Sequence, residues 1–328
     1  MKSHRYEFAA VDLLRIVGWP LVPVACLALA VHTGVRLAWC PRPRPTLDVE
    51  RTILIHQADA TRSTNQAEVL LLGDSSCLMD VSARRLSEQL ARRTLDLGTF
   101  SFLDLNAHAL LLDEYRRHHP VGPQAVVLLM HPEALRRIDS EPYYLSALTS
   151  YYAGTDQPVD TSSGQLAGLV GASQLQGRLL ARLLPTPLPG AYGRHYGFSR
   201  DLDAFMTREH GSVFDPEPQA FSGAPEYRLS PTIEKASRAF RKTVPAQAKL
   251  FVGITPVPAR FAGPKYPARR AELLRDWGAW LQADGLLEEL PATLPDEAFV
   301  RTTHLREPEA LAYTDRLATA LRQRLPQP

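Results

Sequence analysis

The sequence has few cysteines and almost no net charge, and each shortage excludes a class of protein. Three cysteines in 328 residues, Cys26, Cys40 and Cys77, are too few for a disulfide framework. No CxxC pair or Cys/His spacing suggests a zinc site, and we expect no metal or other cofactor. The 37 basic and 35 acidic side chains leave a formal charge of +2, which argues against a nucleic-acid partner. With 45% apolar and 22% charged residues, the composition is that of a globular protein.

A long uncharged run near the N-terminus predicts a membrane anchor. Residues 16–31 carry no charge, and extending the run to Trp39 adds only His32 and Arg36. A membrane span needs about 20 mostly apolar residues, with Trp and Arg side chains at its edges. A cleaved signal peptide and a buried core helix are the alternatives, but no small-residue cleavage site follows clearly. We expect one retained transmembrane helix with the next domain outside the cytoplasm.

Beyond the anchor, strand and helix patterns alternate. The stiff segment PRPRP at 41–45 divides the chain into an anchor with its spacer, 1–45, and a domain, 46–328. Short apolar runs predict buried strands, and apolar residues at helical spacing predict the helices between them. The expected strands are 69–72, 95–97, 125–130 and 250–254, and the expected helices are 82–93, 103–115, 268–283 and 307–325. This alternation predicts an α/β fold, a three-layer α/β/α sandwich with a mostly parallel sheet.

An insertion around 140–230 interrupts this alternation, because the residues there are rich in aromatics, Gly and Pro. One helix is expected in it at 174–184. Its aromatic residues could stack on a glycan or simply pack within the insertion. These residues are Tyr143, Tyr144, Tyr151, Tyr152, Tyr192 and Tyr196, with His195 and His210 nearby.

Residues with catalytic potential follow the first predicted strand. Gly73, Asp74 and Ser75 place a serine hydroxyl at the carboxyl edge of the sheet, beside the start of a helix. Ligands of open α/β sheets bind at that edge, and helix-terminal N–H groups can hold an oxyanion. The same Asp and Ser could also serve only to cap the helix.

A serine nucleophile needs a general base, and His304 is the candidate. It stands just before the last predicted helix, and imidazole is the usual base at neutral pH. One histidine among ten could also be an ordinary loop residue. His304 occurs together with the strand-end Gly-Asp-Ser and with Gly98 after the second predicted strand. This combination is much less readily explained by chance than a single histidine is.

This combination resembles the SGNH/GDSL superfamily of hydrolases and acyltransferases. Gly73-Asp74-Ser75 matches the block with the serine nucleophile, and Gly98 matches the glycine whose N–H helps to form the oxyanion hole. His304 matches the histidine of the last block. The resemblance covers roughly residues 68–325 and implies an SGNH-like fold with an acyl-serine intermediate.

Two positions depart from the superfamily's pattern. Arg301 stands where an aspartate normally precedes the histidine by three residues, and the asparagine of the third block is absent because His131 follows the third strand. We expect the Arg301 side chain to turn away from His304. A backbone carbonyl, a water or an acid would then orient the imidazole, or the site would work as a Ser–His dyad. The candidate acids are Asp296, Glu297 and Asp315. His131 could donate to the oxyanion or only pack at the strand end. Asp74 is expected to fix the loop geometry.

One subgroup of the superfamily is the most similar. An N-terminal anchor, a GDSS loop and an aromatic insertion resemble bacterial membrane-tethered proteins that act beside MBOAT acyltransferases to O-acylate exported polysaccharides or cell-wall polymers. The resemblance implies an MBOAT-type partner, a polysaccharide acceptor and a place on the bacterial inner membrane, with the domain facing the periplasm or cell exterior. Two alternatives remain: a periplasmic lipid or thioester hydrolase, and a non-catalytic module that binds polysaccharide or recruits a partner.

Overall fold

The computed structural model describes residues 10–36, 49–64, 66–100, 103–136, 142–153, 200–215, 221 and 227–325. The chain divides into one unit of residues 1–47 and 156–198, and a second unit of residues 48–155 and 199–328. The first contains α1 (Ala10–Arg36). The second contains the sheet and all the residues discussed below as a candidate site. The helix predicted at 174–184 lies outside the described residues.

Helix α1 occupies the region where the sequence predicts a membrane anchor. Pro20 and Pro23 lie inside it, and large apolar side chains such as Trp19 are exposed on it. In the part of the chain that the structure describes, no helix combines the length and apolar character needed to cross a membrane. The transmembrane element of the predicted fold therefore rests on the sequence alone.

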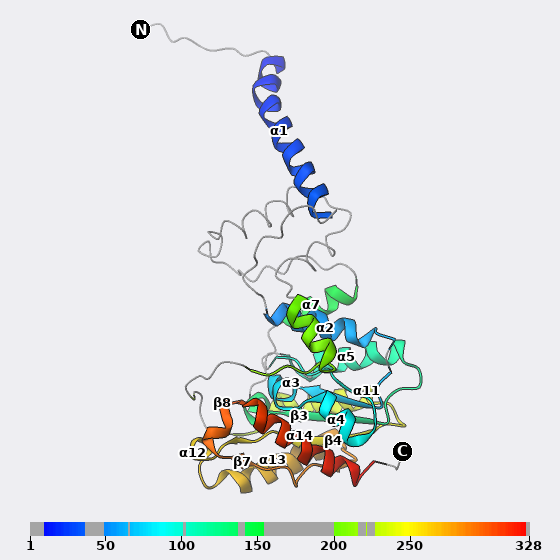
Figure 1. The fold of residues 1–328 in the computed structure, drawn as a ribbon, viewed down its shortest axis with the longest axis vertical. Coiled ribbons are helices and arrows are strands. Elements are labelled where there is room, and N and C mark those ends of the chain that lie inside the picture. The colour runs from blue at the N-terminus through cyan, green and yellow to red at the C-terminus, as the bar shows by residue number, and fades with distance from the viewer. Residues whose placement is uncertain are drawn as a thin grey trace. The chain divides into compact units, whose positions relative to one another are not determined.

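A parallel sheet of five strands forms the centre of the second unit (Figure 1). Its order is β2-β1-β3-β4-β6, and every pairing in it is parallel. The strands are β1 (Val69–Gly73), β2 (Thr94–Asp96), β3 (Ala125–Met130), β4 (Lys249–Ile254) and β6 (Gly285–Leu286). Strands β1 and β3 are buried along their whole length, as expected for apolar runs that consist mostly of Val and Leu.

Helices cover both faces of this sheet. On one face, alternate residues of β1, β3 and β4 pack with α5 (Leu105–His118), α11 (Pro231–Thr243) and α13 (Tyr266–Leu281). On the other face, the intervening residues pack with α3 (Ser75–Asp80), α4 (Ala83–Leu90) and α14 (Glu307–Arg322). The prediction of an α/β fold with a mostly parallel sheet between two helical layers is confirmed.

Shorter elements complete the unit. Strands β5 (Val257–Pro258) and β7 (Thr293–Leu294) pair in parallel, and β8 (Phe299–Arg301) pairs with β9 (His304–Leu305) in a hairpin. Among the described residues, the other helices of this unit are α2 (Val49–Thr61), α6 (Pro132–Arg136), α7 (Pro142–Tyr152), α10 (Arg200–Arg208), α12 (Ala259–Ala262) and the 3₁₀ turn η2 (Asp296–Ala298). Helices α7 and α10, which belong to the predicted insertion, both contact α2.

Capping residues move two helix boundaries from the positions predicted. Helix α5 begins at Leu105 because the carboxylate of Asp104 accepts hydrogen bonds from the N–H groups of Asn106 and Ala107. Helix α4 ends at Leu90 because Ala91 takes a left-handed conformation with φ of 52°. Apolar spacing alone cannot locate such ends.

Candidate active site

The chain turns sharply between the end of β1 and the first turn of α3, and this turn presents Ser75. Gly73 has a φ of +155°, and a Cβ atom there would lie 1.7 Å from the carbonyl oxygen of Leu129 on β3. Only glycine fits such a close approach. The turn therefore places Ser75 at the carboxyl edge of the sheet, where the sequence predicted it.

Asp74 fixes the geometry of this turn. Its Oδ1 accepts hydrogen bonds from the Ser76 N–H (3.0 Å) and hydroxyl (2.6 Å), while its Oδ2 accepts from the backbone N–H of His131 (2.9 Å). Asp74 thus caps α3 and ties the end of β1 to the residue after β3. Burial raises the pKa of this carboxyl, and these hydrogen bonds oppose the shift. The contacts agree with the structural role expected for Asp74.

The two adjacent serines have different environments. Ser76 is fully buried, and its hydroxyl contacts Asp74 and, at 2.9 Å, the Thr255 hydroxyl. Ser75 is partly exposed, and its Oγ lies 3.0 Å from Nε2 of His304. Ser75 and His304 are 229 positions apart in the chain, and they meet at the distance that a serine and its general base require.

Asp215 is the acid that contacts His304, in place of the aspartate that is absent at position 301. Its Oδ2 lies 2.7 Å from Nδ1 of His304, and both side chains are buried, with 5% and 7% exposure. The prediction that Asp296, Glu297 or Asp315 orients His304 is wrong. Asp315 pairs with Arg85 at the start of α4, and Asp296 accepts from the backbone N–H of Arg260. The site is therefore a Ser–His–Asp arrangement and no dyad.

Arg301 does not turn away from the site, contrary to expectation. Its Nε pairs with the same Oδ2 atom of Asp215 that contacts His304. Arg301 stands where the superfamily that the sequence resembles has an aspartate, and here this cation pairs with an aspartate from elsewhere in the chain. Asp215 stands 89 positions before His304, within the predicted insertion, and no local spacing links the two residues.

His131 has the properties of a neutral hydrogen-bond donor. Its Nδ1 accepts from the backbone N–H of Glu133 at 3.2 Å, which assigns the ring proton to Nε2. Nε2 is buried, with no hydrogen-bond partner among the described residues. Burial, and secondarily the nearby His304, lower the pKa of His131 to about 3, so the ring is neutral at physiological pH. Both roles foreseen for His131 are compatible with this place, and an unpaired buried N–H favours the oxyanion donor.

Gly98 does not have the free N–H predicted for it. Its backbone N–H donates to Oδ1 of Asp96 at 2.7 Å, and its carbonyl accepts from the side chain of Gln57. An N–H held by a buried carboxyl cannot also point to an oxyanion. The assignment of Gly98 to the oxyanion hole is therefore wrong for this arrangement, and sequence alone could not show which acceptor takes this N–H.

The tyrosines of the insertion that the structure describes pack within the protein. Tyr144 and Tyr151 donate to the carboxylates of Glu50 and Asp59 on α2. The Tyr152 hydroxyl lies 3.0 Å from that of Thr61, and the Arg62 guanidinium covers its ring. These contacts favour packing over glycan stacking. His210 contacts the Ser87 hydroxyl, while Tyr192, His195, Tyr196 and the side chain of Tyr143 lie outside the described residues.

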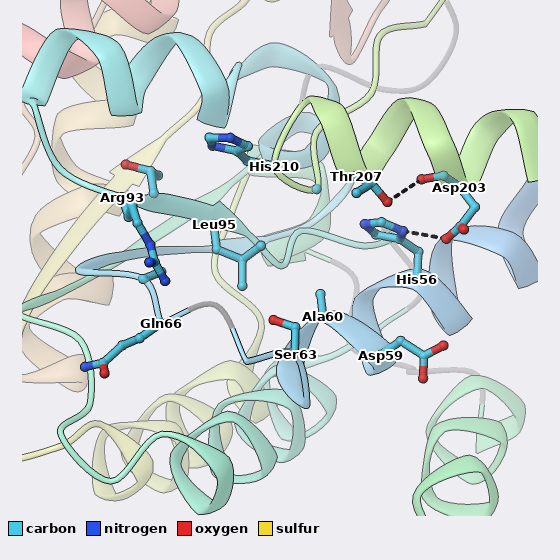
Figure 2. Close-up of a pocket in the computed structure, with 13 residues that line it drawn as sticks. His56, Asp59, Ala60, Ser63, Gln66, Arg93, Leu95, Asp203, Thr207 and His210 are labelled. Carbon is cyan, nitrogen blue, oxygen red and sulfur yellow. Dashed lines mark hydrogen bonds and ion pairs between the residues drawn. The ribbon is translucent and has the colours of Figure 1, made fainter.

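A pocket of about 510 Å³ lies apart from the triad, between α2, α10 and β2. Figure 2 shows His56 of α2 beside Asp203 of α10, and their Nδ1 and Oδ1 atoms are 2.8 Å apart. Ser63, Arg93 and His210 also line the pocket. Within the described ranges, three or more metal-ligating side chains do not gather at any one place.

Comparison with known proteins provides no further guide to the site. No protein-family model, no curated protein and no solved structure matches the chain.

Proposed function

We propose that this protein is a serine esterase or O-acyltransferase of the SGNH type that works through an acyl-serine intermediate. The observation that carries the proposal is the chain of hydrogen bonds from Asp215 through His304 to Ser75, at the carboxyl edge of a parallel sheet. A hydroxyl, an imidazole and a buried carboxylate in this order form the standard apparatus of acyl transfer.

In the proposed reaction, each of the three groups has its own step. With its Nδ1–H donated to Asp215, the His304 ring has its Nε2 lone pair toward the Ser75 hydroxyl. Ser75 Oγ attacks the ester carbonyl as Nε2 takes the hydroxyl proton, and Asp215 stabilises the imidazolium. The tetrahedral intermediate collapses to acyl-Ser75 when His304 returns this proton to the leaving alcohol. Water or a sugar hydroxyl then attacks by the same steps, and Ser75 regains its proton.

His131 is the proposed donor to the oxyanion. It lies beside the Ser75 turn, because its backbone N–H is bonded to Asp74. A neutral Nε2–H can stabilise the oxygen charge that develops in the transition state, as a side-chain amide does in other acyl-transfer enzymes. The buried and otherwise unpaired state of this N–H supports the role.

The resemblance also supplies a substrate and a place in the cell for the proposal. The acceptor is an exported polysaccharide or cell-envelope glycan, and an MBOAT-type membrane protein delivers the acyl group. The uncharged run at 16–31 would tether the protein to the bacterial inner membrane, with the second unit facing the periplasm or exterior. Alkaline carbonate washing of membranes tests this part, because a protein recovered in the wash is not anchored.

Covalent labelling tests the chemistry most simply. A fluorophosphonate probe should label the full chain at Ser75, because the probe needs a serine activated by a base. Ser63→Ala is a matched control, since Ser63 lines the separate pocket near His56. Labelling should vanish in Ser75→Ala and persist in Ser63→Ala. A wild-type chain that is folded and takes no label would favour the non-catalytic module instead.

A further inference from the structure

Asp215 reaches the triad on segment 209–215, whose middle residue, Ser212, makes two buried hydrogen bonds. The Ser212 hydroxyl donates to Oδ2 of Asp96 at 3.0 Å and accepts from the backbone N–H of Ala83 at 2.9 Å. Ala83 is the first residue of α4, and Asp96 is the last residue of β2. Ser212, Asp96 and Ala83 are each fully buried. One hydroxyl thus joins segment 209–215 to a helix and to the sheet.

The backbone on either side of Ser212 is held as well. The carbonyl of His210 accepts from the N–H of Asp96 at 2.9 Å, and the N–H of Val213 donates to the carbonyl of Leu78 at 3.1 Å. Gly211 has a φ of +98°, and a Cβ there would lie 2.1 Å from the carbonyl oxygen of Asp96. This close approach requires glycine and seats the segment against the end of β2.

Burying the carboxyl of Asp96 costs free energy. No basic side chain among the described residues forms an ion pair with it, and its recorded partners are the N–H of Gly98, the Ser212 hydroxyl and the thiol of Cys77. Burial raises its pKa to about 7, and these hydrogen bonds oppose the shift. A buried polar group of this kind orders the groups bonded to it, because leaving any of them unpaired is expensive.

We propose that Ser212 is a positioning residue that sets the place of Asp215 relative to His304. Three residues of chain span at most about 10 Å, so the hydrogen bonds that hold Ser212 limit where the Asp215 carboxylate can lie. Arg301 and His304 then meet that carboxylate at Oδ2. Ser212 acts on the triad only through Asp215. The kinetic part of this inference rests on the proposed function, whereas its geometric part does not.

Ser212→Ala removes both hydrogen bonds and should loosen Asp215. Misplacement of a catalytic group by about 1 Å can cost on the order of 10²-fold. We expect kcat for a small acetyl ester to fall roughly 10- to 100-fold, with KM nearly unchanged because Ser212 does not touch the site at Ser75. Ser82→Ala is the matched control. Ser82 is also a buried serine at the start of α4, and it caps the helix through the N–H of Arg85.

Proton NMR of the full chain supplies a readout that a general loss of stability would not move. The Nδ1–H of a histidine bonded to a buried aspartate gives a resonance far downfield of ordinary amides, which His304→Ala identifies by its absence. We expect this resonance in wild type and Ser82→Ala, and its loss or broadening in Ser212→Ala. Ser212→Thr, which keeps the hydroxyl, should recover it. A resonance and kcat in Ser212→Ala equal to those of Ser82→Ala would overturn the inference.

Two further experimental outcomes bear on the inference: a Ser212→Ala chain that does not fold, and a protein that hydrolyses no ester. If Ser212→Ala does not fold, Ser212→Cys decides, because a thiol fills the place of the hydroxyl and is a much weaker hydrogen-bond partner for Asp96 and for the Ala83 N–H. An unchanged resonance in a folded Ser212→Cys chain would then refute the inference. If the wild type shows the resonance and the variants follow the expected pattern, but no chain hydrolyses an ester, the proposed function fails and the positioning role stands.

Discussion

Two histidine–aspartate pairs in the described part of the chain have nearly the same separation between nitrogen and oxygen. His304 and Asp215 are 2.7 Å apart, and His56 and Asp203 are 2.8 Å apart. The acids differ in burial, because the Asp215 side chain is 5% exposed and that of Asp203 is 38% exposed. The histidines differ in what their second ring nitrogen meets. That of His304 meets the Ser75 hydroxyl, while that of His56 has no hydroxyl bonded to it among the described residues.

A histidine–aspartate pair is therefore not sufficient to identify a catalytic site. The first pair lies where parallel strands end and where the N–H of His131 and the Ser75 turn converge. The second pair joins two helices, α2 and α10, beside the edge strand β2. We conclude that the second pair ties helix α10 of the insertion to α2, and we propose that only the first takes part in acyl transfer. The following variants can break this distinction or sharpen it.

Replacing Ser75 at the first pair and Ser63 in the pocket that His56 lines should give the largest contrast in activity. Ser75→Ala should lower kcat/KM for a small acetyl ester by on the order of 10³-fold or more, because only binding and oxyanion stabilisation remain. Ser63→Ala, in the pocket near His56, should leave the rate nearly unchanged. Ser76→Ala should cost much less activity than Ser75→Ala, although it removes one hydrogen bond from Asp74 and one from the Thr255 hydroxyl. Equal losses at Ser63 and Ser75 would erase the distinction between the pairs.

Neutralising each acid tests the pairs directly. Asp215→Asn should lower kcat by roughly 10³-fold or more, since the amide favours the wrong imidazole tautomer and does not stabilise the cation. Asp203→Asn makes the same change in the other pair and should leave kcat close to that of the wild type. Steady-state kinetics on both variants, with circular dichroism to check folding, make the measurement. A larger loss for Asp203→Asn would move the catalytic centre to the pocket.

Much of the fold, but only part of this site, could be predicted from the sequence. The buried strand 125–130 was predicted with both ends correct, because a run of Val, Leu and Met covered on both faces carries its own signal. Ser75 and His304 were found because each stands at the end of such a pattern. Asp215 was missed because no local spacing links it to His304. The segment that carries it is joined to distant parts of the chain by hydrogen bonds at His210, Ser212 and Val213, which the sequence does not reveal.

The oxyanion donor comes next in expected size. His131→Phe removes the Nε2–H and should lower kcat by on the order of 10²-fold, the usual effect of losing one oxyanion donor. His131→Asn keeps a side-chain N–H and should retain more of the rate. Because the pKa of His131 is lowered to about 3, its protonation should not contribute to the pH dependence of kcat between about pH 5 and 8. A wild-type rate in His131→Phe would assign this histidine to packing alone.

The smallest effect concerns protein stability and Asp96, the carboxyl that accepts from Ser212. The pKa of Asp96 is raised to about 7, so the native state keeps a proton that the unfolded chain releases near pH 4. The free energy of unfolding should therefore fall as pH rises from about 4 to about 7 and level off above that. Asp96→Asn lacks this titration, so its stability relative to wild type should increase over that interval. Urea unfolding at several pH values measures this, and parallel pH profiles would contradict the assigned shift.

Trapping of the acyl-enzyme tests the central claim most directly. The full chain is mixed with an activated acetyl ester, quenched in acid after a fraction of one turnover and digested for mass spectrometry. The account predicts one acetyl group on the peptide that contains Ser75, with fragment ions placing it on Ser75 and none on Ser76, and its absence in Ser75→Ala. Acetylation of another residue with Ser75 unmodified, or turnover of the ester that persists in Ser75→Ala, would contradict it.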